Sequence, residues 1–127
     1  MTRLHLELEH APEVVGVARR DAGEHVRGSW PALHGLDDLV DDVRLVTSEL
    51  VGNAVRHGEA PVTLDVDVEL VDGRHRVVIT CHDGGPWDGS DPSPASGRGL
   101  VLVDALCTGV VIDADHTHTT VVATLER

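Results

Sequence analysis

Strict alternation of apolar and polar side chains over residues 62–70 constrains the fold more than any other feature of the chain. A strand with this period has one face buried and the other in water. The pair Asp72-Gly73, typical of a tight hairpin turn, comes next and predicts a second strand over about residues 75–81. A chain with this hairpin must therefore cover one face of an antiparallel sheet with its other elements.

Two amphipathic helices are predicted ahead of the hairpin. The first begins near Pro12, which suits a first helical turn, and keeps apolar residues at helical spacing as far as Val26. The second runs from Asp37 to His57, and the acids in its first turn suit the helix dipole. Its apolar stripe comprises Leu39, Val43, Val46, Leu50 and Ala54.

Shorter segments complete the pattern. We expect a strand over residues 4–8, loops over 28–35 and 82–96, a short helix over about 100–107, and a closing hairpin of 110–112 and 121–125. The order is strand, helix, helix, two strands, helix, two strands. It predicts the α+β class, as a two-layer α/β sandwich with a mostly antiparallel sheet and helices on one face.

Composition limits both the architecture and the partners. A length of 127 residues suits one domain over residues 1–127, and without Phe or Tyr its core must consist mainly of Val, Leu and Ala. The net charge of −12, with no stripe of basic residues, argues against nucleic acid and anionic membranes as partners. The absence of Lys excludes a P-loop lysine, a Schiff-base lysine and a Ser-Lys dyad.

Cysteine usage and hydropathy suggest a compartment. Cys81 and Cys107 both lie in apolar contexts, so we expect two buried free thiols rather than a disulfide. The N-terminus lacks an apolar signal core, and no apolar run approaches membrane-spanning length. We therefore expect a cytoplasmic protein.

Two polar residues at the edge of the second helix are candidate functional groups. Glu49 and Asn53 lie four residues apart and share a helical face, at the rim of the apolar stripe. A carboxylate there can take a proton, and an amide oxygen is a hard ligand for Mg²⁺. By itself, such a pair is typical of the solvated edge of an amphipathic helix.

Two glycine motifs follow in the chain. Asp83-x-Gly85 ends a strand, where a carboxylate can accept the exocyclic amine of adenine and a glycine lets a flat base approach the backbone. Gly97-x-Gly99 precedes a helix, whose N-terminal N–H groups can bind phosphate. Each motif alone is typical of an ordinary turn.

Together and in this order, the motifs closely resemble those of the GHKL (Bergerat-fold) ATP-binding proteins, over about residues 4–125. The matching segments are an N box, SELVGNAVRHG at 48–58, a first glycine box, DGGP at 83–86, a second, SGRGL at 96–100, and a final-strand threonine in TTV at 119–121. Within that superfamily the short chain most resembles the stand-alone anti-sigma factor serine kinases, because it has no room for a phosphoacceptor or transducer domain. The resemblance implies a single ATP-binding domain of the histidine kinase-like ATPase fold.

The resemblance also implies a role for each residue of the N box. Glu49 would be the catalytic general base for a protein hydroxyl or for water. Asn53 would ligate the Mg²⁺ that bridges the phosphates of ATP, and Arg56 and His57 would lie near those phosphates.

The glycine boxes would hold the remainder of the nucleotide. Asp83 would bind the adenine amine, assisted by Gly85 and Thr120. The residues expected to cover the phosphates are Gly97, Arg98 and Gly99.

Several positions depart from the family pattern. Trp87 stands where the first glycine box normally has a further Gly, and His118 stands where the segment before Thr120 usually has one. The lid over residues 88–96 is short, acidic and contains proline. These departures predict weak nucleotide binding, or a lid that orders only with a partner.

The resemblance implies a protein serine/threonine kinase that regulates transcription. It would transfer phosphate from ATP–Mg to a serine of a STAS-type antagonist, sequester a sigma factor, or do both. The relatives work as homodimers, and the strand over residues 4–8 is a candidate edge for such a dimer. The alternative is a catalytically weak nucleotide-binding module that acts by protein contact alone.

Two other kinds of site receive less support. His116 and His118, near Asp113 and Asp115, suggest a metal site, but no His-Glu-x-x-His or Cys-x-x-Cys spacing accompanies them. We interpret them as solvated hairpin residues. A Cys-His hydrolase is weaker still, because both cysteines have the pattern of core residues.

Overall fold

The computed structural model describes residues 1–30, 35–87 and 100–127. Within these ranges the chain forms five strands and three helices, in the predicted order. Their bounds are β1 Thr2–Leu8, α1 Val14–Ser29, α2 Asp37–His57, β2 Val62–Val71, β3 Arg74–Asp83, α3 Leu100–Leu106, β4 Gly109–Ala114 and β5 Thr119–Glu126.

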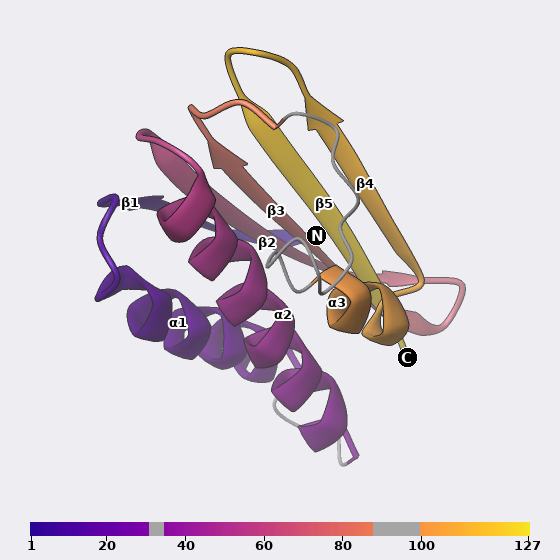
Figure 1. The fold of residues 1–127 in the computed structure, drawn as a ribbon. Helices are drawn as coiled ribbons and strands as arrows, with labels where there is room; N and C mark the ends of the chain where they lie inside the picture. The colour runs from indigo at the N-terminus through magenta and orange to yellow at the C-terminus, as the bar shows by residue number, and fades with distance from the viewer. Residues whose placement is uncertain (31–34, 88–99) are drawn as a thin grey trace.

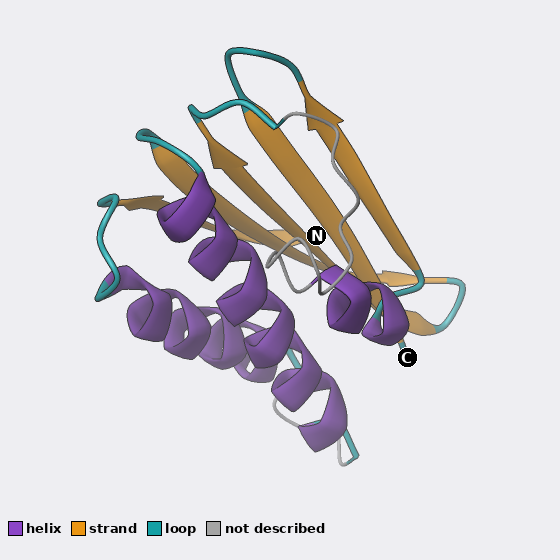
Figure 2. Cartoon of the chain, in the orientation of Figure 1, coloured by secondary structure: helices purple, strands orange, loops and turns teal. Residues whose placement is uncertain are grey.

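The strands form one antiparallel sheet in the order β1-β2-β3-β5-β4. Figure 1 shows the three helices on the same face of this sheet, and Figure 2 shows the resulting layers of helix and strand. The predicted α+β sandwich is therefore confirmed. The β2–β3 turn has positive φ at Asp72 (52°) and Gly73 (77°), as a two-residue hairpin of the predicted kind requires.

The core lies between the two layers and includes the first four apolar positions of the alternation, whereas the last, Leu70, is 61% exposed. Val62, Leu64, Val66 and Val68 of β2 are at most 3% exposed, and they pack in one cluster with buried residues of α1 and α2. Complete burial of one such side chain stabilises the fold by about 1.5–3 kcal/mol. The burial energy of one side chain is larger than the intrinsic preferences of ordinary residues for a helix, which differ by about 0.7 kcal/mol or less. Packing therefore decides which face of the sheet the helices cover.

The other face of the sheet carries ion pairs between neighbouring strands. Arg3 of β1 donates two hydrogen bonds to Asp67 of β2, with Nε–Oδ1 at 2.6 Å and Nη2–Oδ2 at 2.9 Å. Asp67 raises the pKa of the Arg3 guanidinium, through these hydrogen bonds first and charge second. Arg76 pairs similarly with Glu126 at 2.7 Å. The charged positions of the alternating strands thus find partners across the sheet.

The helices of the described ranges include none that is long and apolar enough to cross a membrane.

Candidate functional site

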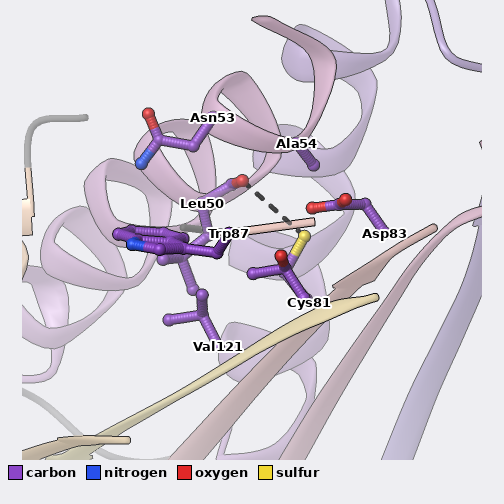
Figure 3. A pocket seen from close by; sticks show the side chains of 8 residues that line it. Leu50, Asn53, Ala54, Cys81, Asp83, Trp87 and Val121 are labelled. Carbon is purple, nitrogen blue, oxygen red and sulfur yellow. Dashed lines mark hydrogen bonds between the residues drawn. The ribbon is translucent and has the colours of Figure 1, made fainter. Parts of the chain in front are cut away.

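A pocket lies between the last turns of α2 and the adjoining ends of β3 and β5 (Figure 3). Its volume is about 280 Å³, counting space open to solvent. We call the α2 side, with Leu50, Asn53 and Ala54, the helix wall. The sheet wall comprises Cys81, Asp83, Thr119 and Val121, and Trp87 completes the lining.

The antiparallel register explains how four residues of two strands form the sheet wall. Asp83 is paired with Thr119, and Cys81 with Val121. Because alternate side chains of a strand point to the same face, both pairs project toward the helices. All four residues are at most 7% exposed.

Asp83 is the ionisable residue at the sheet wall, and backbone N–H groups fix its position. Its Oδ1 accepts the N–H of Gly85 at 2.7 Å and the N–H of Glu59 at 3.4 Å. The carboxylate is 7% exposed. A carboxylate accepts hydrogen bonds but donates none while ionised, so this group can select a ligand that presents an N–H donor.

The end of α2 comes close to this carboxylate. The helix ends at His57, as predicted, and the N–H of Gly58 still donates to Ala54 O at 3.1 Å. Gly58 has φ −98° and ψ −168°, which are open to any residue. A Cβ at this position would collide with the Asp83 carboxylate. The glycine is therefore required by close approach and not by a left-handed backbone.

Asn53 is the N-box residue that reaches the pocket. It is 7% exposed, and its Oδ1 accepts a hydrogen bond from Arg56 Nη2 at 3.2 Å. Gly52 leaves room for this arrangement, because a Cβ there would lie 2.9 Å from Arg56 Nη1. An amide oxygen at the edge of the pocket fits the predicted magnesium ligand in chemistry.

The other N-box candidates lie around the pocket and do not line it. Glu49 is half-buried on α2, one helical turn before Asn53, while Arg56 and His57 are exposed at the end of the helix. The structure thus brings Asn53 and Asp83 to one pocket, with Gly85 bonded to Asp83. Glu49, Arg56 and His57 lie nearby on the same helix.

The two threonines at the start of β5 face opposite sides of the sheet. Thr119 lines the pocket and its hydroxyl donates to Gly85 O at 2.9 Å. The Thr120 hydroxyl is instead 2.8 Å from His82 Nδ1, on the face away from the helices. Thr120, which the sequence predicts to assist Asp83, thus lies on the opposite face of the sheet from the pocket. The apolar positions Val121 and Ala123 share the parity of Thr119, and that signal in the sequence was sufficient to identify it.

The predicted phosphate-covering residues Gly97, Arg98 and Gly99, and the predicted lid over 88–96, lie outside the described residues.

Sequence reasoning did not place two residues that line the pocket. Cys81 was predicted to be a buried free thiol, and it is; its Sγ donates to Leu50 O at 3.7 Å. Burial raises the pKa of this thiol to about 12, with a smaller contribution from the Asp83 charge. Trp87 was noted only as a departure from the glycine box, yet the structure buries its indole in the pocket lining to 8% exposure.

The histidines near the last hairpin have other partners. His118 stacks on His82 with ring centroids 5.7 Å apart, and its N–H donates to Asp115 Oδ1 at 3.1 Å. Hydrogen bonds from Thr117 lower the Asp115 pKa to about 2. In the part of the chain that the structure describes, no group of three or more His, Cys, Asp or Glu is placed to hold a metal ion.

Comparisons with known proteins agree with this architecture. The profile of the family described as "Histidine kinase-like ATPase domain" matches residues 6–125. No curated protein matches the chain.

Two examples illustrate the solved structures that share the fold. One contains the RsbU and RsbW domains of Rv1364c from Mycobacterium tuberculosis, with 24% identity and a TM-score of 0.68 over all of this chain and 33% of that one. The present chain thus spans about a third of its length. The other is the histidine kinase domain of the blue-light activated histidine kinase EL346 from Erythrobacter litoralis. It has 14% identity and a TM-score of 0.51, over 98% of this chain and 69% of that one.

Proposed function

Because the chain belongs to the family of histidine kinase-like ATPase domains, we propose that it binds ATP in the pocket between α2 and the sheet. The observation that carries this proposal is Asp83, a buried carboxylate in a pocket with otherwise largely apolar walls. Adenine offers an exocyclic amine to such an acceptor, while its flat ring suits apolar walls such as Leu50 and Val121. Residues 1–127 would form one ATP-binding domain.

The phosphates of ATP would extend toward the end of α2. Asn53 would hold Mg²⁺ through its amide oxygen, and the ion would neutralise phosphate charge there. Arg56 now donates to that same oxygen, at 3.2 Å. If that oxygen held the ion, the guanidinium would be available to pair with a phosphate, and His57 would be the neighbouring phosphate contact.

We propose that the chemistry is transfer of the terminal phosphoryl group to a serine of a partner protein. The serine oxygen attacks the γ-phosphorus, the bond from that phosphorus to ADP breaks, and Glu49 takes the serine proton. The half-buried position of Glu49 supports this role, because its carboxylate is accessible to a second protein. Gly97, Arg98 and Gly99 would cover the phosphates, as the family resemblance implies.

The partners we propose are a sigma factor, a STAS-type antagonist with an acceptor serine, or both. The likeness to a structure whose title names an RsbW domain supports an anti-sigma role. A net charge of −12 favours a basic surface on the partner. Among the strands that the structure describes, β1 is at one edge of the sheet, so one side of its backbone would be available for pairing in a homodimer. Such an activity belongs in the cytoplasm, where ATP and the transcription machinery are found.

One observation favours a second candidate function, a nucleotide-binding interaction module without kinase activity. Trp87 replaces a glycine of the first glycine box and is buried in the pocket lining. A side chain of that size reduces the space for a nucleotide, so binding would be weak and transfer slow.

The test is a capture experiment followed by a transfer assay. The tagged protein is used to capture partners from its native cell, with and without ATP–Mg²⁺, and the captured proteins are incubated with γ-labelled ATP. Label on a serine of a captured protein supports the kinase. If the capture of a partner depends on ATP but no captured protein becomes labelled, the result supports the interaction module without kinase activity. If calorimetry detects no binding of ATP or ADP at millimolar concentration, both candidates are wrong.

A further inference from the structure

The indole of Trp87 occupies the apolar part of the proposed nucleotide pocket. It is 8% exposed and belongs to the same core cluster as Leu50, Cys81 and Val121, which also line the pocket. Figure 3 shows the flat ring against Leu50, with Asp83 across the pocket from it. The side chain is therefore packed between the helix wall and the sheet wall.

This packing leaves too little room for a purine. An indole and a purine are both flat, fused bicyclic rings, so a slot that fits one fits the other. A base held by its amine at Asp83 would extend between the two walls, toward the space of the indole. The open space between the two walls has a cavity volume of only about 10 Å³. A cavity of that size holds about one water molecule and no purine.

The burial also distinguishes a plug from a stacking platform. A platform presents one ring face to the ligand, and an indole that is 8% exposed has no open face. Trp87 lies outside the helices and strands, four residues after the end of β3. Its backbone takes no part in the pairing of β3 with β2 or β5, so moving the side chain does not require the strands to separate.

We propose that Trp87 is an internal plug, which fills the purine slot and must swing out before an adenine nucleotide binds. The inference rests on the proposed function and adds its regulation. The apparent affinity for nucleotide falls with the fraction of molecules whose plug is out, so an open fraction of one in ten weakens binding about tenfold. A partner that draws the indole out would raise nucleotide affinity by the same factor.

Fluorescence tests the movement directly, because the chain has only two tryptophans. In Trp30→Phe, Trp87 is the sole indole, and its emission before ligand has the short wavelength of a buried ring. Saturating ADP, verified by calorimetry on the same sample, shifts the emission to longer wavelength as the ring enters water. Bound ADP with unchanged emission overturns the plug and leaves the proposed function standing.

Affinity provides the second readout. Trp87→Ala binds ADP about tenfold more tightly than the parent, because the slot is open in every molecule. Val26→Ala is the matched control: it removes volume from the same core at a buried residue of α1 that does not line the pocket, and leaves ADP affinity unchanged. Equal or weaker ADP binding by a folded Trp87→Ala overturns the plug. ADP binding by neither protein overturns the proposed function and the plug with it. If Trp87→Ala does not fold, the emission of Trp30→Phe decides.

Discussion

The sheet wall differs from the end of α2 beside the pocket in how exposed its polar side chains are. On the sheet wall, Asp83 and Thr119 are buried, and each is hydrogen-bonded to Gly85. On the helix side, Asn53 is buried too, but Glu49 is half-buried and Arg56 is exposed, so these two side chains can reach solvent. A fixed acceptor suits recognition of a base, whereas accessible side chains suit contact with phosphates and a second protein. We expect binding to depend on the sheet wall and phosphoryl transfer on the helix side.

The largest effect that follows is on the rate of transfer. Glu49→Gln should slow phosphoryl transfer by about 10²–10⁴-fold, the usual contribution of a general base. It should leave ADP affinity unchanged, since the base acts only in the chemical step. The measurements are the initial rate of label transfer and calorimetry with ADP. Glu24→Gln, at an exposed carboxylate on α1, is the control and should change neither. If Glu49→Gln transfers phosphate at the parental rate, the assignment of phosphoryl transfer to the helix side is wrong.

Asp83→Asn should have the next largest effect, on binding alone. The change replaces an acceptor by an amide and should weaken ATP and ADP by about 1.5–3 kcal/mol, as for a hydrogen bond to a charged group. GTP should bind poorly to the parent protein, because its O6 is an acceptor that would face a carboxylate. Asp113→Asn, at an exposed position of β4, is the control for loss of one negative charge. Equal parental affinities for ATP and GTP would contradict the role of Asp83.

The close approach of Gly58 to the Asp83 carboxylate predicts that a side chain at residue 58 lowers the stability of the fold. Gly58→Ala places a Cβ against the Asp83 carboxylate and should lower the free energy of unfolding by about 1–3 kcal/mol, as overpacking does. Gly28→Ala is the matched control, because a Cβ there has no atom within 4 Å and the residue is in α1. That control should be neutral or gain up to about 1 kcal/mol from helix propensity. Urea denaturation measures both, and equal stability of the two variants would show that the contact at Gly58 yields without cost.

The helix side of the site could be predicted from the sequence because a helical period is local. The spacing of Glu49 and Asn53 places them on one face of α2 whatever the rest of the chain does. The alternation over 62–70 is equally local, and it correctly predicts a strand whose apolar face is buried as far as Val68; at the end of the strand, Leu70 is 61% exposed. These parts of the fold needed no knowledge of distant contacts.

The sheet wall depended on contacts between distant segments, and prediction was less complete there. The family resemblance implies a role for Thr120, but a shift of one residue along a strand moves a side chain to the opposite face, and Thr119 is the threonine that lines the pocket. The requirement for glycine at 58 follows from the approach of Asp83, which lies far along the chain. Trp87 is in a loop, where no helical or strand periodicity in the sequence indicates which way a side chain points. The alternation of Thr119, Val121 and Ala123 could have identified the first of these features, whereas only the assembled sheet and helices fix the other two.

The smallest expected effect tests which of the two threonines at the start of β5 faces the pocket. Thr119→Val removes the hydroxyl that donates to Gly85 O at 2.9 Å. Gly85 also donates its own N–H to Asp83. ADP affinity should fall by about 0.5–1.5 kcal/mol, the net value of one neutral hydrogen bond. Thr120→Val is the same chemical change on the opposite face, where the hydroxyl pairs with His82, and it should leave ADP affinity unchanged. Calorimetry on the two variants compares them directly. A larger loss in Thr120→Val would mean that the face away from the helices contributes to binding, and the assignment of the sheet wall would then be wrong.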